Sequence, residues 1–299
     1  MSLQTLLQTC SIREPIQKGW SSDKKFRISD GAGTSYLLRI SDRSTLSAKQ
    51  TEYEMMCKTA ETGISMCRPV AFGVTDEGVC SVQEWIDGVD LEDVLLTKSR
   101  EEQYRLGCLA GQSLAKIHTI AAPGEREDWA VYFNRKIDRK LRVYADCPLK
   151  YARGDAFVSF LSENRHLLAD RPQTFHHGDF HVGNMMLDTK GDLVIIDFNR
   201  ADFGDPWEEF NRIVWSAQCS PVFASGCVDG YFADGVPMLF WRLLALYIAS
   251  NTLSSLPWAI PFGEDEIATM RRQADEVLLW YDGMRRVVPS WYQPLRQET

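Results

Sequence analysis

Hydrophobic and polar residues alternate with strand-like spacing in the first part of the chain and recur with helical spacing in the rest. "KKFRISD" and "SYLLRIS" flank "GAG" at 31–33 and predict a β-hairpin, because glycine readily adopts the positive φ of a tight turn. The next segment, "LSAKQTEYEMMCKTAETGI", has apolar residues at helical spacing and ends at Gly63. "RPVAFGVTDEGVCSVQEWI" predicts two more strands around the turn at 75–78. We therefore expect the order β, β, α, β, β up to about residue 86.

Helical patterns dominate the remainder. Apolar residues recur every three or four positions over 101–120, and further helices are expected at 155–169, 207–219, 236–255 and 264–284. "NMMLD" and "LVIID", joined by "TKGD", interrupt them with a strand pair within 185–197. The predicted fold class is α+β, with a small antiparallel-sheet N-lobe at 1–86 that holds one main helix and a larger, mostly helical C-lobe at 87–299.

Composition indicates a folded chain of ordinary size. The chain has 299 residues, 44% of them hydrophobic, and nine tryptophans, which is enough for a sizeable core. The formal net charge of −8 argues against nucleic acid or an anionic membrane as the main partner. The most apolar run, "VPMLFWRLLALYIAS", is interrupted by Arg242 and is too short to cross a bilayer, so we expect a buried helix.

Cysteine usage and the amino-terminal sequence predict a cytoplasmic protein. The eight cysteines contain no C-x-x-C pair, which predicts reduced thiols rather than a zinc framework or a disulfide scaffold. "MSLQTLLQTCSIREP" lacks the basic end and the apolar stretch of a signal peptide. The oligomeric state stays open.

The segment "HHGDFHVGNMML" (176–187) gathers polar residues directly before the predicted strand pair, which ends at Asp197. Two antiparallel strands of matched length return Asp197 to the level of Asn184, with Asp179 nearby. An amide oxygen beside a carboxylate suits Mg²⁺, which takes few protein ligands and keeps its waters. The third carboxylate can then accept a proton from a hydroxyl nucleophile. This layout is the one that phosphoryl transfer from a nucleotide requires.

Two other interpretations of this segment remain. The hairpin could be a solvated polar turn, which the full spaced pattern disfavours. A zinc site is also conceivable, although adjacent histidines point in different directions, and its ligands would be His176, His177, His181 and Asp179.

The pattern "HGDFHVGN", followed by "IIDF" and by "GDP" at 204–206, resembles the aminoglycoside phosphotransferase family. The family consists of small-molecule kinases with the two-lobed fold of protein kinases. The resemblance implies that Asp179 is the catalytic base and that Asn184 and Asp197 hold the metal ions that bridge the nucleotide phosphates. It also implies three supporting residues: His177 bracing the catalytic loop, Asp205 anchoring it from the helical lobe, and His181 positioning it.

The same resemblance implies a phosphate-binding cation on the third strand and a glutamate on the next helix that holds it. Arg39 and Glu52 fit these roles, with Glu54 as the alternative to Glu52. A surface arginine that merely caps a strand is the structural alternative for Arg39.

The connector "VQEWIDG" (82–88) lies where the family binds adenine through backbone groups. The implied partners are the Glu84 carbonyl and the Ile86 amide, and the implied floor of the base pocket is Met186 with Ile196. All four are also ordinary strand residues.

Three positions depart from the pattern. No Gly-rich phosphate loop is present, since "QKGWSSDKKF" contains only Gly19 with Ser21 and Ser22. Asn199 stands where protein kinases have glycine, and we expect it to adopt the left-handed backbone of that turn. Glu209 stands where relatives often have aspartate.

Acidic clusters at 125–129, 206–210 and 263–267, with Trp207, Trp215 and Trp258 nearby, suit an ammonium compound. Acidic residues are also common at solvated helix starts, so this argument has a structural alternative.

The sequence therefore predicts a Mg²⁺-dependent kinase that uses ATP or GTP and phosphorylates a hydroxyl group of a small, cationic molecule. An aminoglycoside is the first candidate, and choline, an amino alcohol or a sugar are the alternatives. A nucleotide-binding pseudokinase that acts through protein contacts is a third hypothesis, which the retained Asp179, Asn184 and Asp197 disfavour.

Overall fold

The computed structural model describes residues 2–17 and 22–294. Internal contacts divide the chain into a first unit, Met1–Leu91 with Asn184–Ala201, and a second unit, Glu92–Gly183 with Asp202–Thr299. The segment Asn184–Ala201 thus groups with the amino-terminal residues, whereas we expected everything after residue 86 to belong to the C-lobe.

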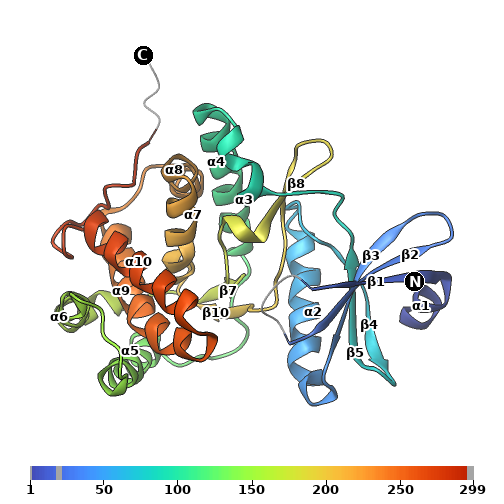
Figure 1. Cartoon of the computed structure of the whole chain (residues 1–299), viewed down its shortest axis with the longest axis horizontal. Coiled ribbons are helices and arrows are strands. Elements are labelled where there is room, and N and C mark those ends of the chain that lie inside the picture. Colours follow the sequence, from blue (N-terminus) through green and yellow to red (C-terminus); the bar gives the residue numbers. More distant parts are fainter. Residues whose placement is uncertain (1, 18–21, 295–299) are drawn as a thin grey trace. The chain divides into compact units, whose positions relative to one another are not determined.

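The first unit contains a five-stranded antiparallel sheet in the order β1-β2-β3-β5-β4 (Figure 1). Its strands are β1 (Cys10–Ile16), β2 (Lys24–Asp30), β3 (Ser35–Ser41), β4 (Pro69–Thr75) and β5 (Gly78–Glu84). The two predicted strand pairs are confirmed, and Gly33 supplies a positive φ of 88° in the first turn. β1 was not predicted, because its five central residues are all exposed and give no alternation.

Two helices pack on this sheet. α1 (Leu3–Thr9) contacts β1 and β4, and the predicted helix α2 (Leu46–Glu61) packs on β4 and β5. A short 3₁₀ turn, η1 (Arg43–Thr45), leads into α2. Alternating residues of the strands, such as Ile28, Leu38 and Val82, close over Leu6 to form the core of the sheet.

A second, three-stranded sheet belongs to the first unit and has the order β6-β8-β9. Its strands are β6 (Gly88–Asp90), β8 (Met185–Asp188) and β9 (Leu193–Ile195), so the predicted strand pair is confirmed. Ile195 N donates to Ser65 O at 3.0 Å and Cys67 N donates to Ile195 O at 3.1 Å. These bonds join the hairpin to the segment between α2 and β4.

The second unit is mainly helical. Its long helices are α4 (Arg100–Ile117), α5 (Trp129–Asp146), α6 (Gly154–Asn164), α7 (Ile213–Cys219), α8 (Pro221–Tyr231), α9 (Met238–Ala259) and α10 (Glu264–Trp280). Shorter pieces are α3 (Leu91–Val94), which begins at the unit boundary, η2 (Leu95–Thr97), η3 (Arg165–Leu168), η5 (Glu208–Arg212), η6 (Ile260–Phe262), and the strands β7 (Thr174–His176) and β10 (Asp202–Gly204), which pair antiparallel. The five predicted helical segments are confirmed, but α5 and α8 were missed.

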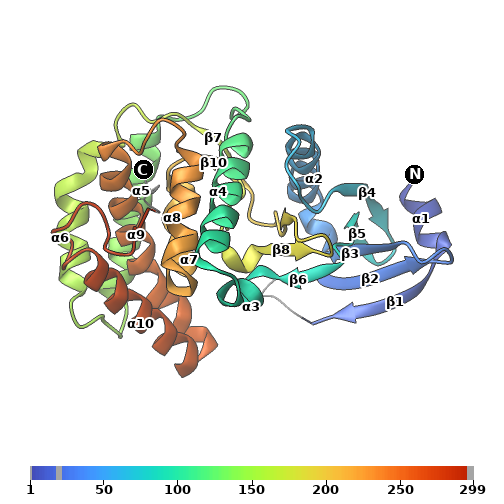
Figure 2. The same cartoon turned by 90° about the horizontal axis from the view of Figure 1, so that it is seen from above.

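Helices α4 and α8 lie side by side (Figure 2) because glycines face each other across their contact. A Cβ atom at Gly107 would lie 2.2 Å from Phe223 O, and one at Gly226 would lie 2.3 Å from Tyr104 O. Side chains at these positions would push the helices apart. Because α8 carries this glycine face and is buried on most of its surface, it shows no amphipathic pattern, which explains why the sequence did not reveal it.

The expectation for the apolar run needs one correction. α9 has 22 residues and is long and apolar enough to cross a membrane, so it is not too short, although Arg242 interrupts it. Most of the helix is nevertheless buried inside the second unit, where it packs against α5, α6 and α10. The prediction of a buried core helix is confirmed.

Candidate active site

Asp179 lies in the second unit, in the loop that follows β7 and runs from 177 to 183. Its carboxylate is 17% exposed, and Arg212 Nε lies 3.2 Å from Asp179 Oδ1. His181 Nε2 lies 3.7 Å from the same oxygen. The buried His177 ring lies beneath the loop, where its Nδ1 accepts a hydrogen bond from Asp179 N at 3.3 Å. Asp179 is therefore held at the surface of the unit with a guanidinium beside it.

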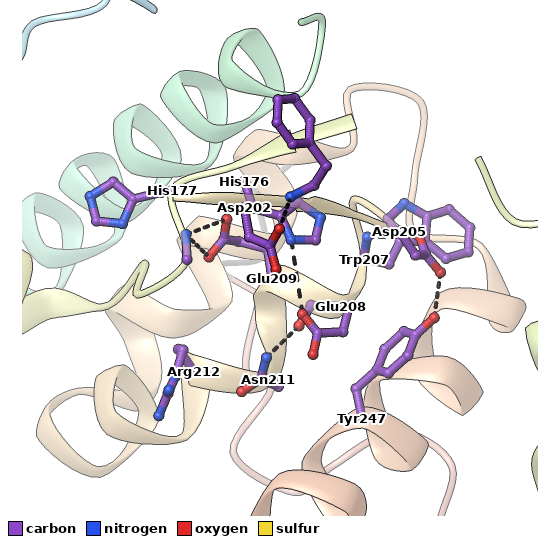
Figure 3. A network of polar contacts seen from close by, with 12 residues as sticks. His176, His177, Asp202, Asp205, Trp207, Glu208, Glu209, Asn211, Arg212 and Tyr247 are labelled. Atoms are coloured by element: carbon purple, nitrogen blue, oxygen red, sulfur yellow. Dashed lines mark hydrogen bonds and ion pairs between the residues drawn. The ribbon is translucent and has the colours of Figure 1, made fainter. Parts of the chain in front are cut away.

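Glu209 fixes the beginning of this loop, a role that the sequence analysis did not assign (Figure 3). Gly178 N donates to both carboxylate oxygens of Glu209, at 3.0 and 3.1 Å. The carboxylate is 2% exposed, and His118 Nε2 lies 4.0 Å away. Burial opposes ionisation, but the neighbouring His118, His176 and His177 lower the pKa of Glu209 to about 2. The buried, ionised side chain of Glu209 thus orients the backbone next to Asp179.

Asp205 was predicted to anchor the loop, but its own hydrogen bonds go elsewhere. Its fully buried carboxylate accepts from Arg171 at 2.7 and 2.9 Å and from Tyr247 Oη at 2.5 Å. The Arg171 guanidinium also lies 3.9 Å from the ring centroid of Trp207. Asp205 therefore ties the segment before β7 to α9 (Figure 3), and the direct contact with the loop comes from Glu209 instead.

The end of the loop is held by His181 and by α7. Gly183 N donates to His181 Nδ1 at 3.1 Å, and Val182 N donates to Ser216 Oγ at 3.0 Å. His177 and His181 are four residues apart, which converges on a metal only on a helix, and the segment between them lies before the short 3₁₀ helix η4 (Val182–Asn184). Among residues 2–17 and 22–294, no three His, Cys, Asp or Glu side chains form a metal-binding group.

In the first unit, the hairpin register brings Asn184 and Asp197 together. Met185 pairs with Ile195, and Ile196 N donates to Asn184 O at 3.0 Å, so Asp197 follows directly beside Asn184. Asp197 itself has a positive φ of 66°. Asn199 does not, so the expectation that Asn199 takes the left-handed conformation is wrong. The residue in this conformation is the carboxylate-bearing one, two positions after the end of β9.

Arg39, on β3, is 4% exposed and donates to Asp197 Oδ1 at 2.7 Å. A second carboxylate, Asp23, lies 3.5 Å from Arg39 Nη2. Burial lowers the pKa of Arg39, but the charge and hydrogen bond of Asp197 outweigh burial and raise it. Arg39 is thus a buried, fully ionised group rather than a surface cap.

The expected direct pair between Arg39 and Glu52 is not formed. Glu52 instead accepts from Lys49 at 2.9 Å, and Lys49 also reaches Asp23 at 3.2 Å. Burial is the main influence on Glu52 and raises its pKa. Since no hydrogen bond joins Glu52 and Arg39, Glu52 acts on Arg39 only through its charge. The alternative, Glu54, is exposed and accepts from Gln50 on the outer face of α2.

These donors fit a hard divalent cation. Asn184 and Asp197 offer an amide and a carboxylate oxygen at neighbouring positions, and Asp197 is 33% exposed. The Arg39 guanidinium places positive charge against Asp197 at 2.7 Å. Mg²⁺ prefers oxygen ligands of this kind and small number.

The connector after β5 offers a free backbone donor at Ile86. Within the described part of the chain, the Ile86 N–H makes no intramolecular hydrogen bond, whereas Glu84 N donates to Arg68 O at 2.8 Å. Met186 and Ile196 lie on one face of the β8–β9 hairpin and are both only partly buried. A cavity of about 440 Å³ adjoins this connector but is lined by Ile64, Arg68 and Val194 rather than by Met186 or Ile196. Gly19 and Ser21 lie outside the described residues.

The acidic clusters are largely engaged in structure. Asp128 caps α5 by accepting from Val131 N at 3.1 Å, and the cluster at 263–267 forms the first turn of α10. Glu208 and Glu209 are directed into the protein. Trp207 lies under Arg171, as described above. These features support the structural alternative for the clusters, since acids at helix starts offset the helix dipole.

Basic residues on α5 face the same region as η5. Lys136 Nζ lies 3.2 Å from Glu208 Oε1. One turn later, Lys140 is partly buried and has no hydrogen bond or ion pair within residues 2–17 and 22–294. Burial, followed by the nearby charge of Lys136, lowers the pKa of Lys140 to about 7. The helix that carries both lysines is α5, which the sequence analysis missed.

Comparison with known proteins assigns the family. A family model described as the phosphotransferase enzyme family (APH) matches residues 12–241. The chain belongs to this family. The resemblance found in the sequence is thereby confirmed, and at this coarse level the protein is a small-molecule phosphotransferase. No curated protein matches the sequence.

Solved structures of similar fold support the kinase-like α+β architecture. A choline/ethanolamine kinase family protein from Mesorhizobium loti has a TM-score of 0.67 and 17% identity, covering 95% of this chain and 94% of that one. A GDP complex of aminoglycoside 2′-phosphotransferase-IIIa has a TM-score of 0.68 and 13% identity, covering 94% and 96%. A complex of aminoglycoside phosphotransferase APH(4)-Ia with ADP and hygromycin B has a TM-score of 0.64 and 15% identity, covering 92% and 97%.

The Glu209 anchor gives a first prediction for this phosphotransferase. Glu209→Gln removes the charge that binds Gly178 N, so the free energy of unfolding should fall by about 1–3 kcal/mol. Catalytic turnover should fall as well, because the loop loses its fixed backbone. Urea unfolding and steady-state kinetics measure both, and Glu163→Gln, at an exposed position, is the control. Equal stability of Glu209→Gln and the control would contradict the anchoring role.

Lys140 gives a prediction about pH and stability. Its pKa is about 7 in the folded state against 10.5 in the unfolded chain, so the unfolded state binds more protons between these values. Stability of the wild type should therefore rise with pH across this window, with the full penalty present below about pH 7. Lys140→Met should raise Tm by about 2–4 °C at about pH 6, and the gain should shrink towards about pH 10.

The control for this experiment is Lys116→Met, at an exposed position of α4. It should show no difference from wild type that changes with pH. A Lys140→Met gain that stays constant with pH would indicate simple packing rather than relief of a buried charge.

Proposed function

We propose that this protein transfers the γ-phosphoryl group of ATP or GTP to a hydroxyl group of a small molecule. The observation that supports the proposal is the hairpin register, with Ile196 N bonded to Asn184 O at 3.0 Å, because it puts the two residues that carry an amide and a carboxylate at adjacent positions. Few functions other than metal–nucleotide binding require this pair next to a buried arginine.

In this proposal, Asn184 and Asp197 hold Mg²⁺, which when bound offsets the negative charge of the phosphate oxygens. Arg39 contributes a second fixed cation, and its planar guanidinium suits two phosphate oxygens at once. When phosphates arrive, Arg39 can exchange its bond with Asp197 for bonds to them. Asp23 and Lys49 keep the guanidinium in place during this exchange.

The nucleotide base is proposed to bind through the connector after β5. The Ile86 N–H is an available donor, and the Glu84 carbonyl is the proposed acceptor beside it. Met186 and Ile196 present partly exposed apolar surface that can stack against a purine.

Asp179 is the proposed base. The acceptor oxygen attacks the γ-phosphorus, the bond from that phosphorus to the bridging oxygen of the nucleotide breaks, and the nucleoside diphosphate leaves. The proton of the acceptor hydroxyl passes to the Asp179 carboxylate. His177, Glu209 and His181 hold the loop so that this carboxylate keeps one position.

Acceptor candidates include those predicted from the sequence. An aminoglycoside remains a candidate because similar folds bind aminoglycosides and hygromycin B, although identities of 13–15% transfer no specificity. Choline, an amino alcohol or a sugar are further candidates, and the fold of the choline/ethanolamine kinase family protein keeps choline in the comparison.

The first experiment replaces the proposed base. Asp179→Asn removes the proton acceptor but keeps the size of the side chain, so kcat should fall by about 10²- to 10⁴-fold. ADP release with an accepted substrate measures transfer, and calorimetry should still detect nucleotide binding. Asp234→Asn, an exposed carboxylate of the same unit, is the control. Turnover of Asp179→Asn within tenfold of wild type would remove Asp179 from this role.

The second experiment tests the metal ligand. Asp197→Ala should weaken binding of the Mg²⁺–nucleotide complex by about tenfold or more, because a charged ligand is lost. Without Mg²⁺, the same variant should lose little affinity, since Arg39 is then free for the phosphates. Calorimetry with and without Mg²⁺ separates the two cases, and Asp192→Asn in the same hairpin is the control. Equal losses with and without Mg²⁺ would refute metal binding by Asp197.

A further inference from the structure

The buried carboxylate of Glu209 has a single hydrogen-bond donor. Within residues 2–17 and 22–294, this donor is Gly178 N, which is shared between both carboxylate oxygens at 3.0 and 3.1 Å. One N–H group does not satisfy two buried carboxylate oxygens, because each of them can accept two hydrogen bonds. The loop before Asp179 therefore depends on an anion that needs further support from its surroundings.

His118, directly after α4, is placed to give this support. Its buried ring directs Nε2 towards Glu209, with 4.0 Å between Nε2 and Glu209 Oε2, and this nitrogen has no hydrogen bond to any described residue. On the other side of the ring, Nδ1 lies 2.9 Å from the hydroxyl of Tyr231, the last residue of α8. The ring thus connects the end of α8 with the carboxylate that fixes the loop.

The close packing of α4 and α8 sets this geometry. A Cβ atom at Gly111 would lie 2.7 Å from Tyr231 N, so glycine at this position lets the end of α8 approach α4. The His118 backbone is bound to its own helix, since His118 N donates to Leu114 O at 3.0 Å. His118 and Tyr231 therefore belong to two packed helices, whereas Glu209 belongs to the short 3₁₀ turn η5.

The neighbours of the ring determine which nitrogen carries its hydrogen. Burial lowers the pKa of His118 more than the charges of Glu209 and Asp205 raise it, so the ring is neutral at neutral pH and has one N–H. His176, whose ring centroid lies 5.6 Å away, also lowers this pKa. A bare lone pair on Nε2 would be repelled by the ionised Glu209, which places the hydrogen on Nε2. Nδ1 is then the acceptor, and the Tyr231 hydroxyl donates to it.

We propose that His118 is a positioning residue for phosphoryl transfer, because its Nε2–H stabilises the Glu209 carboxylate in the orientation that binds Gly178 N. Glu209 in turn fixes the backbone before Asp179, so His118 acts on the proposed base without touching the substrate. This inference rests on the proposed function, which takes Asp179 as the base. The whole chain of contacts, which begins at Tyr231 and ends at Gly178, lies within the second unit.

Two substitutions separate the N–H of His118 from the packing of its ring. His118→Phe fills the site but removes the donor, so kcat should fall by about tenfold or more, while the KM for ATP should change less than about twofold. His118→Gln returns an N–H near the position of Nε2 and should restore kcat to within about threefold of wild type. ADP release measures both, with hygromycin B, choline or glucose as the acceptor. A kcat for His118→Phe within about twofold of wild type overturns the inference.

A double-mutant cycle tests whether His118 acts through Glu209. If it does, adding His118→Phe to Glu209→Gln should change kcat by less than about twofold, because the carboxylate that the N–H stabilises is already gone. If the two losses multiply, His118 acts independently of Glu209, and the inference is overturned. The control for a simple loss of stability is Leu106→Ala, at a fully buried position earlier in α4, which should lower Tm without lowering kcat.

Amide hydrogen exchange tests the inference without the reaction. Gly178 N is bonded to Glu209, whereas Val182 N, in the same loop, is bonded to a side chain of α7. The ratio of the Gly178 exchange rate to the Val182 exchange rate, measured by NMR, should therefore rise about tenfold in His118→Phe. In the Leu106→Ala control the ratio should stay as in wild type. An unchanged ratio in His118→Phe refutes the positioning role.

Failure of this inference differs from failure of the proposed function. If wild type phosphorylates none of the acceptors, the panel gives the proposed function no support, and the exchange ratio alone decides whether His118 orders the loop. If transfer occurs but His118→Phe leaves kcat and the exchange ratio unchanged, the kinase stands and the role of His118 is overturned.

Discussion

Uncompensated burial of a carboxylate strongly destabilises a protein, and the second unit places two of them, Asp205 and Glu209, at the centre of its polar network. Each is stable only because donors surround it: Arg171 and Tyr247 for Asp205, and Gly178 N for Glu209. The requirement also works in reverse, because donors that must satisfy these anions cannot move independently. The bonds from Gly178 N to Glu209 both satisfy this buried carboxylate and fix the backbone before Asp179, so folding of the unit and placement of the base are one constraint.

Electrostatics in the first unit follow the same logic with the signs exchanged. Arg39 is almost completely buried and lies between two carboxylates, of which Asp197 is the more exposed at 33% and Asp23 the less exposed at 8%. Asp197 makes the shorter contact with Arg39, at 2.7 Å, whereas Asp23, which Lys49 also contacts, lies at 3.5 Å. Two carboxylates keep the Arg39 guanidinium charged. In the proposed function, the more exposed of the two, Asp197, is the one that meets the metal ion. Glu52 supports Lys49 rather than Arg39, so the helix contributes indirectly.

Sequence reasoning succeeded where one physical rule determines the outcome. Turn signals between apolar runs located β2, β3, β4 and β5, and the register of the second hairpin puts Asp197 one residue beyond the partner of Asn184. It failed where burial depends on distant partners. β1 has no buried central position, and α8 is apolar on nearly all sides, so neither has a recognisable period. Glu209 shows only as a departure from aspartate, because no local pattern reveals that a glutamate four residues after Asp205 turns inward to a loop.

The charge at the acceptor side illustrates why bulk composition could not predict the substrate. A net charge of −8 suggests attraction of cations. Many of the acids counted in it are already paired inside the protein, however: Asp128 caps the start of α5, and Glu208 pairs with Lys136. What a ligand meets is the remainder within about one Debye length of Asp179, roughly 8–10 Å. In the second unit the charges at this loop are those of Arg212, which pairs with Asp179 at 3.2 Å, and of the buried Glu209 that binds Gly178 N. The charges that remain close to Asp179, rather than the total charge of the chain, therefore decide which acceptor the site can take.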